Sequence, residues 1–256
     1  MTSNTTTMDT APAAAPAASS GARVRVWDLP VRVFHWALAG SFGAAYVLAE
    51  SERLRQVHVM LGYTVLGLIA FRLLWGFVGT HYARFAQFSF GPRAVLRYLG
   101  ALAGGRPEHH VGHNPAGSWA IWAILGLGAA TGITGYMTFN ELGGESLEEL
   151  HEAFANAWLV VVFVHVAGVI VSSLLHRENL VGAMLSGYKR VAAGVGATEV
   201  PARAVVGIVA ALAIAAFWAL SLLGVGPAAA PDGEAYGQAG DSGQAAMAGE
   251  RDDDDD

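Results

Sequence analysis

Five long apolar runs set the main limit on what this chain can fold into. They lie at about 31–49, 57–79, 118–138, 151–174 and 204–224. Each is close to the roughly 20 residues that an α-helix needs to cross a hydrocarbon core of about 30 Å. Charged residues make up only 14% of the 256 residues, which is roughly half of the fraction in an average globular protein. The sequence therefore predicts an all-α protein that spans the lipid bilayer five times.

Basic residues gather on one side of these predicted spans. The loops on that side contain Arg23, Arg25, Arg32, Arg84, Arg93, Arg97, Arg106, Arg177, Lys189, Arg190 and Arg203. The loop at 139–150, on the other side, contains no basic residue and four glutamates: Glu141, Glu145, Glu148 and Glu149. By the positive-inside rule the N-terminus is cytoplasmic. Loop 139–150 and the C-terminal tail are then expected outside, in the periplasm of a bacterium with this protein in its inner membrane.

Both ends of the chain have a composition that is typical of disorder. Residues 1–22 are rich in Ala, Thr and Pro, and residues 225–256 are rich in Gly, Ala and Asp and end in RDDDDD. Such segments cannot bury enough apolar surface to fold. The first 22 residues have no apolar centre and are not a signal peptide, and the first apolar run is too long for a signal core.

The absence of cysteine excludes several kinds of redox site. With no Cys in the chain, disulfides, iron–sulfur clusters and covalently attached c-type haem are excluded. Nucleic-acid binding is not expected either, because no basic stripe exists outside the loops that flank the spans. Histidine is the best remaining ligand for a transition metal. The loop sequence HHVGH at 109–113 is either a metal site or a solvated cluster.

Four further histidines lie within or at the ends of the predicted spans. His151 and His165 are fourteen residues apart on the fourth span. At about 100° and 1.5 Å per residue, both rings project from nearly the same helix face, about 21 Å apart. His35 lies near the cytoplasmic start of the first span, and His58 near the outer start of the second. Depth therefore pairs His58 with His151 and, less closely, His35 with His165.

Paired histidines on facing helices can ligate a haem iron from both sides. Such an iron has no open coordination position, so the haem transfers single electrons. Two haems along one helix would carry electrons across most of the membrane. Arg72 lies fourteen residues after His58 and so at the inner depth, where its guanidinium could pair with a haem propionate or snorkel to the headgroups. Gly128 and Gly132 would let a helix or a flat ligand approach closely.

Several motifs together resemble the bacterial cytochrome b561 / nickel-hydrogenase cytochrome b family. They are VWDLPVRVFHW at 26–36, HVMLGYTVLGLIAFRLLWGFVGTHYARF at 58–85, ATGITGYM at 130–137 and LEELHEAFANAWLVVVFVHVAGVI at 147–170. The resemblance covers about residues 24–190. It implies a four-helix transmembrane bundle with two haem b groups, whose ligands are His35, His58, His151 and His165.

The same resemblance implies a function and a division of the chain. Proteins of this family move electrons between the quinone pool and a partner on the outer face, as subunits of respiratory oxidoreductases. The partner here is open: a hydrogenase, a c-type cytochrome or another oxidoreductase subunit. Residues 23–190 would form the cytochrome b561-like domain, between the disordered segment 1–22 and an extra transmembrane helix at 204–224, with 225–256 as an acidic tail.

Two other functions remain open from the sequence. A haem-free transporter or metal carrier would use the membrane histidines as ligands or proton relays, but it would not explain their pairing by depth. A structural anchor for a soluble partner would leave them without a role. The glutamates of loop 139–150 also predict attraction of a basic redox partner.

Overall fold

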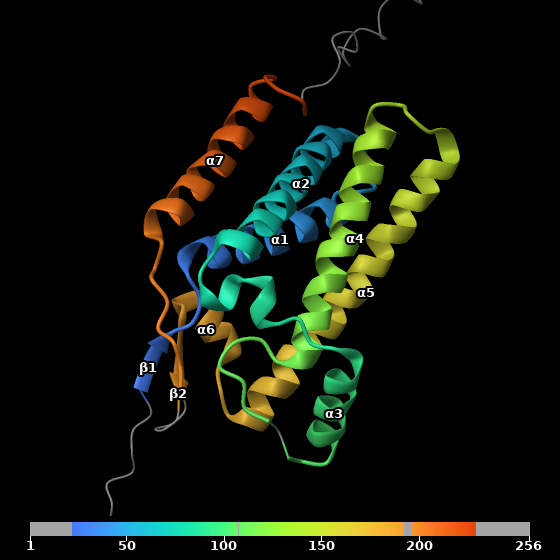
Figure 1. The fold of residues 1–256 in the computed structure, drawn as a ribbon. Coiled ribbons are helices and arrows are strands. Elements are labelled where there is room, and N and C mark those ends of the chain that lie inside the picture. Colours follow the sequence, from blue (N-terminus) through green and yellow to red (C-terminus); the bar gives the residue numbers. More distant parts are fainter. Residues whose placement is uncertain (1–21, 107, 192–195, 229–256) are drawn as a thin grey trace, which may run out of the picture.

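The computed structural model describes residues 22–106, 108–191 and 196–228. Disorder predicted for residues 1–21 and 229–256 lies outside the described residues. At the boundary, Ala22 is not part of a disordered segment, because it begins a short β-strand. The described chain is mostly helical, as the sequence predicts (Figure 1).

Five long helices correspond to the five apolar runs. They are α1 (Leu29–Val47), α2 (Arg55–Val78), α4 (Pro115–Phe139), α5 (Gly144–His176) and α7 (Ala204–Leu222). Four segments are long and apolar enough to cross a membrane: Glu52–Val78, Pro115–Phe139, Gly144–His176 and Ala204–Leu222. The segment of α1 is not among these four, although its 19 residues have the required length.

Shorter elements connect the long helices at one end of the molecule. They are the strands β1 (Ala22–Arg25) and β2 (Tyr188–Val191), the helices α3 (Pro92–Ala103) and α6 (Leu180–Ser186), and 3-10 turns at His81–Ala83 and Phe85–Gln87. A further 3-10 turn, Glu52–Leu54, precedes α2. β1 and β2 pair antiparallel, with Ala22 opposite Val191 and Arg25 opposite Tyr188.

The long helices pack around a core of aromatic and aliphatic side chains. Its centre includes Phe42 of α1, Ile69 of α2, Leu125 of α4 and Trp158 of α5. A Cβ atom at Gly128 would lie 2.7 Å from the Trp158 ring and 2.8 Å from Ile69. Gly128 therefore lets α4 pack closely against both α5 and α2. Along the chain, α4 packs against α5, α1 against α2, and α7 against α1.

Local sequence signals set where the helices begin. Asp28 caps α1 by accepting a 2.9 Å hydrogen bond from the Val31 amide, and Asn114 caps α4 in the same way. Helix α5 begins at Gly144, seven residues before the predicted start at 151. The reason is that its first turns carry glutamates, which end an apolar run but do not end a helix.

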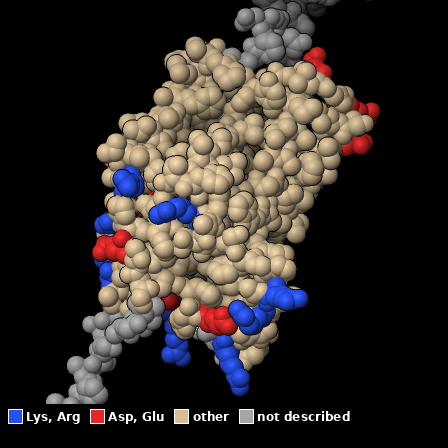
Figure 2. Space-filling view, viewed as in Figure 1, with Lys and Arg blue, Asp and Glu red and all other residues tan. Residues whose placement is uncertain are grey.

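The charges divide between the two ends of the molecule. Figure 2 shows Lys and Arg mainly toward the end that carries β1, β2 and α3, and acidic residues at the tip between α4 and α5. The wide band between them is almost free of charge in this view. The exposed apolar side chains of the long helices include Phe163 and Val164 of α5 and Leu212 of α7, as expected where helices face lipid.

Candidate functional site

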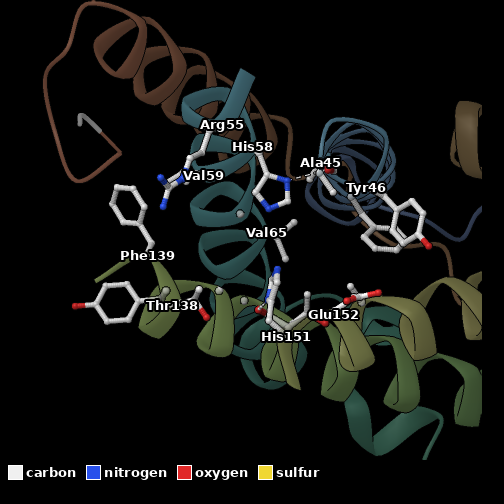
Figure 3. Close-up of a pocket in the computed structure, with 18 of the residues that line it drawn as sticks. Ala45, Tyr46, Arg55, His58, Val59, Val65, Thr138, Phe139, His151 and Glu152 are labelled. Atoms are coloured by element: carbon white, nitrogen blue, oxygen red, sulfur yellow. Dashed lines mark hydrogen bonds between the residues drawn. The ribbon is translucent and has the colours of Figure 1, made fainter. Parts of the chain in front are cut away.

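His58 and His151 approach each other from two helices that are far apart in the sequence. His58 lies in the first turn of α2, and His151 lies in the second turn of α5. Their ring centroids are 6.2 Å apart and the ring planes are nearly perpendicular. Figure 3 shows the two rings facing each other across a cavity.

Hydrogen bonds fix the protonation of both rings. Nδ1 of His58 lies 2.9 Å from the carbonyl oxygen of Ala45, and Nδ1 of His151 lies 2.9 Å from that of Thr131. Carbonyl oxygens only accept hydrogen bonds, so each Nδ1 is the donor. In a neutral imidazole the other nitrogen, Nε2, then keeps its lone pair free. This arrangement is typical of histidines that ligate a metal.

The cavity between the two rings has a volume of about 620 Å³. Its walls are largely apolar and come from α1, α2, α4 and α5. The apolar lining includes Phe42, Val59, Val65, Leu66 and Trp158. Cofactor sites usually have volumes of about 300–1,000 Å³ and mostly apolar walls. The cavity therefore suits a large, mainly apolar ligand with a central group between the histidines.

Glycines give the cavity its shape. Gly62, Gly132 and Gly135 line it. A Cβ atom at Gly135 would lie 2.8 Å from Cε1 of His151, so any side chain there would push the imidazole away. At Gly132 a Cβ would instead meet Leu66 at 2.5 Å. The small residues of α4 thus serve both helix packing and the position of His151.

The spacing of the rings fits a metal between them. Imidazole nitrogen binds Zn²⁺ at about 2.0–2.1 Å, so two imidazoles on opposite sides of a metal of this size have centroids roughly 6 Å apart. The observed separation is 6.2 Å. Together with the largely apolar cavity and two free Nε2 atoms, this spacing fits a haem iron with two histidine ligands.

His35 and His165 are the two residues of the predicted inner pair. His35 lies on α1 and His165 on α5, and the two side chains are close enough to interact electrostatically. The His35 ring contacts Trp36, with ring centroids 5.0 Å apart. Its Nδ1 is buried and has no hydrogen-bond partner. A buried imidazole with an unpaired nitrogen indicates a missing partner, such as a ligand.

Arg72 is buried on the inner half of α2. Only 3% of its surface is exposed. Its guanidinium donates a 3.0 Å hydrogen bond to the carbonyl of Ala83 and lies 5.0 Å from the centre of the Phe85 ring. The group is therefore held by protein and not exposed to headgroups. The fully buried Asp28, which precedes α1, interacts with Arg72 electrostatically, so a haem propionate is not its only available counter-charge.

Asp28 is itself held by several donors. Its carboxylate accepts hydrogen bonds from the Trp75 indole at 3.0 Å and the Thr80 hydroxyl at 2.7 Å, besides the Val31 amide. Such bonds stabilise a buried carboxylate. Asp28 thus joins the start of α1 to the end of α2.

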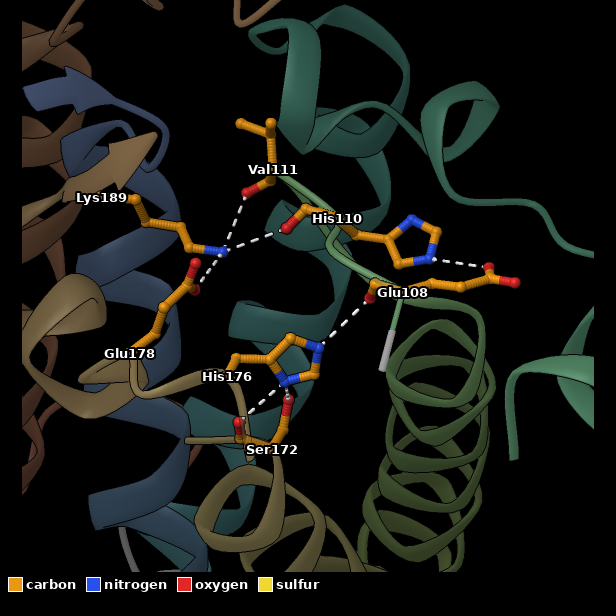
Figure 4. Close-up of polar contacts among 7 residues, drawn as sticks. All are labelled: Glu108, His110, Val111, Ser172, His176, Glu178 and Lys189. Carbon is orange, nitrogen blue, oxygen red and sulfur yellow. Dashed lines mark hydrogen bonds and ion pairs between the residues drawn. The ribbon is translucent and has the colours of Figure 1, made fainter. Parts of the chain in front are cut away.

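A polar cluster anchors the loop at 108–113 (Figure 4). Lys189 of β2 forms a 3.0 Å ion pair with Glu178 and donates to the carbonyls of His110 and Val111 at 3.1 and 3.3 Å. His176, at the end of α5, lies 3.2 Å from the carbonyl of Glu108. The loop is thereby fastened to the segment that follows α5.

The anchored loop places His113 against two aromatic rings. Its ring centroid lies 4.7 Å from that of Trp27 and 4.5 Å from that of Phe88. Burial, and to a smaller extent the positive charge of Arg72, lowers the pKa of His113 to about 3. Burial also lowers the pKa of His110. Both imidazoles are therefore neutral at physiological pH.

The histidines of HHVGH do not gather into a metal site, which is one of the two possibilities predicted for this loop. Within residues 22–106, 108–191 and 196–228, no group of three or more His, Cys, Asp or Glu side chains is placed to hold a metal ion. His81, His110 and His113 instead line a second cavity of about 210 Å³, which is mostly polar. The predicted alternative, a solvated cluster, fits the exposed His109 but not His113, which packs against Trp27 and Phe88.

Two residues that line the outer cavity are not predicted as site residues from the sequence. Arg55 lines its rim, and Trp158 forms part of its wall. Trp158 is 2% exposed, with its ring centroid 4.0 Å from that of Phe42. It lies seven residues from both His151 and His165, hence on the same face of α5. That spacing is a signal in the sequence, whereas only the fold reveals the role of Arg55 as a rim residue.

The chain resembles known proteins over most of its length. The family model described as prokaryotic cytochrome b561 matches residues 26–187. A protein of Cupriavidus necator named "Probable Ni/Fe-hydrogenase B-type cytochrome subunit" is 26% identical, over 68% of this chain and 91% of its own length. Proteins of the same name from Azotobacter vinelandii and, as hydrogenase 1, from Escherichia coli K12 are 25% and 23% identical. They align over 65% and 64% of this chain, and over 88% and 89% of their own lengths.

No solved structure matches the chain. The family model alone covers more than half of the 256 residues. Its range includes both histidine pairs, Arg72 and the outer cavity, so the site described above lies within the matched region. The chain belongs to the prokaryotic cytochrome b561 family.

Proposed function

We propose that this protein is a membrane-bound b-type cytochrome that transfers electrons between the quinone pool and a redox partner on the periplasmic face. The observation that carries the proposal is the outer site. Two imidazoles with free Nε2 atoms face each other at 6.2 Å across an apolar cavity of about 620 Å³. We propose that His58 and His151 hold one haem b there, and that His35 and His165 hold a second.

Haem supplies a centre that accepts and releases one electron at a time. The protein supplies everything else at the site. The carbonyls of Ala45 and Thr131 keep Nδ1 of His58 and His151 protonated, so both rings present Nε2 to the cavity. Hydrogen bonds of this kind orient the ligands and make them more basic. The apolar walls would limit water around a bound haem, and with both histidines as ligands the iron would have no position left for oxygen.

We propose that the inner site also takes one histidine from each of two helices, His35 from α1 and His165 from α5. Helix α5 carries His151 and His165 on nearly the same face, about 21 Å apart along its axis. Trp158 lies midway between them and is buried against Phe42. Electrons would therefore pass along α5 from one haem to the other. Arg72, buried beside Phe85 and Phe88, would provide positive charge near the inner haem.

Orientation and partners follow from charge and from the relatives. The basic end that carries β1, β2 and α3 would face the cytoplasm of a bacterial inner membrane, by the positive-inside rule (Figure 2). The relatives are named as cytochrome subunits of a Ni/Fe-hydrogenase, so we propose a hydrogenase as the first partner to test. A c-type cytochrome or another oxidoreductase subunit on the outer face is the alternative.

Haem counting tests the proposal directly. The purified protein in detergent should give b-type bands in a reduced-minus-oxidised spectrum and about two haems per chain in a pyridine haemochrome assay. His58→Ala and His151→Ala should each lose the outer haem, whereas His81→Ala, a loop histidine outside both pairs, should lose none. A colourless protein from haem-supplied cells would refute the proposal and favour the transporter or the structural anchor. One haem would refute the inner pair alone.

A further inference from the structure

The rim of the outer cavity is strongly acidic. Its charged residues are Glu50, Glu52, Glu148, Glu152 and Arg55. All five side chains belong to exposed residues. Arg55 is thus the single cation among the residues that line this cavity. Any anionic part of a ligand would be repelled by most of the rim and attracted at one position.

Arg55 is free to take an anionic partner. In the described ranges, the side-chain ion pairs are His110–Glu108 and Lys189–Glu178, and neither includes Arg55. Nor does its guanidinium donate a hydrogen bond to any described residue. The residue precedes His58 by three positions, so the two side chains are neighbours on α2. Figure 3 shows both side chains extending from α2 at the cavity.

The position of Arg55 in its helix also favours an anion. It is the first residue of α2, whose first turn contains no acidic residue and whose N-cap makes no side-chain hydrogen bond. A cation at a helix N-terminus is disfavoured by the helix dipole, whereas an anion is stabilised there. An anion that binds Arg55 would therefore offset this unfavourable placement.

Haem b carries negative charge on one edge only, which matches a rim with a single cation. It carries its carboxylates, the propionates, on one edge, and the remaining edges are apolar. We infer that Arg55 pairs with a propionate of the haem held by His58 and His151, and so fixes which edge of the haem faces the outer mouth. The inference rests on the proposed function, because it assumes a haem in this cavity.

The pairing of Arg55 with a propionate would also influence the reduction potential of the outer haem. A positive charge beside the haem favours the reduced iron, and the four glutamates of the rim favour the oxidised iron. Removing Arg55 should therefore lower the reduction potential of the outer haem. For charges about 10 Å apart at an effective dielectric constant of about 20, we expect roughly a tenfold change in the ratio of reduced to oxidised haem. For one electron this corresponds to about 59 mV.

A redox titration with a matched control tests the inference. Arg55→Gln should lower the potential of one of the two haems by this amount and leave the other unchanged. Arg53→Gln removes an exposed arginine that does not line the cavity, and it should change neither potential. Arg55→Lys keeps the charge but not the bidentate fork. The potential of its affected haem should therefore lie between that of Arg55→Gln and that of the unaltered protein.

Chemical modification of the haem separates pairing from a general charge effect. Apoprotein from haem-limited cells would be loaded either with haem b or with its dimethyl ester, which has no free propionate. If Arg55 pairs with a propionate, the effect of Arg55→Gln on the potential should shrink severalfold with the ester. An undiminished effect with the ester would overturn the pairing, as would equal potentials in Arg55→Gln and Arg53→Gln.

The outcome also distinguishes this inference from the proposed function. If His151→Ala loses one haem while Arg55→Gln leaves both potentials unchanged, the proposed function stands and the pairing is wrong. If His151→Ala retains both haems, the outer site itself is wrong. If cells accumulate too little of the Arg55→Gln protein, Arg55→Lys takes its place. Its haem potentials are then measured with haem b and with the dimethyl ester, and the same comparison tests the pairing.

Discussion

Replacing Gly135 with alanine should displace His151 and weaken the outer haem site. The added Cβ would lie 2.8 Å from Cε1 and 3.1 Å from Nδ1 of His151. Non-bonded carbon atoms pack at about 3.5–4.0 Å, so the ring must move by about 0.7 Å or more. The 2.9 Å hydrogen bond from Nδ1 to the Thr131 carbonyl would then stretch or bend, because such bonds span only about 2.7–3.2 Å.

The size of the effect follows from the loss of that support. Removing a hydrogen-bond partner of a metal-bound histidine typically costs about 10–100-fold in metal affinity, or about 1.4–2.7 kcal/mol. Gly126→Ala is the matched control, because Gly126 lies on the same helix and no heavy atom is within 4 Å of the added Cβ. Both changes improve helix propensity by up to about 1 kcal/mol, so propensity cannot explain a difference between them.

Titration of haem into apoprotein would measure the difference. Gly135→Ala should bind about one haem per chain at the affinity of the unaltered protein and the second 10–100-fold more weakly. Gly126→Ala should bind both haems as the unaltered protein does. Equal binding by the two variants would show that the contact between Gly135 and His151 does not control the site, and the reasoning from ring position would fail.

Three further predictions concern other parts of the molecule. Changing Glu145, Glu148 and Glu149 to Gln should flatten the salt dependence of electron transfer to a basic partner such as a c-type cytochrome; an unchanged slope in stopped-flow kinetics would exclude docking at this loop. Because burial lowers the pKa of His113 to about 3, its contribution to stability is complete above pH 6.5 and declines as the pH falls toward 3. Between pH 7 and pH 5, His113 should therefore cost the unaltered protein about 2 kcal/mol of unfolding free energy. In His113→Phe this part of the loss should be absent, as measured by thermal unfolding at the two pH values. Arg72→Lys should destabilise the inner end by about 1–2 kcal/mol through loss of the stacked, hydrogen-bonded guanidinium; an unaltered melting temperature would refute this.

The helices could be predicted from the sequence because the bilayer demands a simple pattern. A run of about 20 apolar residues is a strong signal, and the helices at Arg55–Val78 and Ala204–Leu222 begin and end within two residues of the predicted ranges. The start of α5 was predicted seven residues too late, because hydropathy detects the membrane and not the helix. Strands β1 and β2 are four residues each, and their pairing depends on residues 163 or more positions apart.

The candidate site could be predicted only in part. Helical periodicity places His151 and His165 on one face of α5, and opposite chain directions place His58 at the depth of His151. Periodicity does not show the contact between Gly135 and His151, or that Arg55 borders the cavity. Nor does it show that Asp28, outside every predicted span, lies close enough to interact with Arg72. These features depend on how helices rotate and pack, which a single sequence does not specify.

The pairing of β1 with β2 limits how many times the chain can cross the bilayer. Residues that are hydrogen-bonded to each other, such as those of Ala22–Arg25 and Tyr188–Val191, must lie on one side of a core about 30 Å thick. The chain between them must therefore cross an even number of times. Of the helices selected by length and apolarity, three lie in this interval: α2, α4 and α5.

Parity thus requires one more crossing between the strands. Helices α3 and α6 have 12 and 7 residues, and at 1.5 Å per residue neither reaches across the core. Helix α1, with 19 residues, is long enough. We infer that α1 crosses the membrane despite its lower hydropathy, and that α7 adds an unpaired fifth crossing. The end of α7 at Leu222 would then face the compartment opposite to the one that contains both strands.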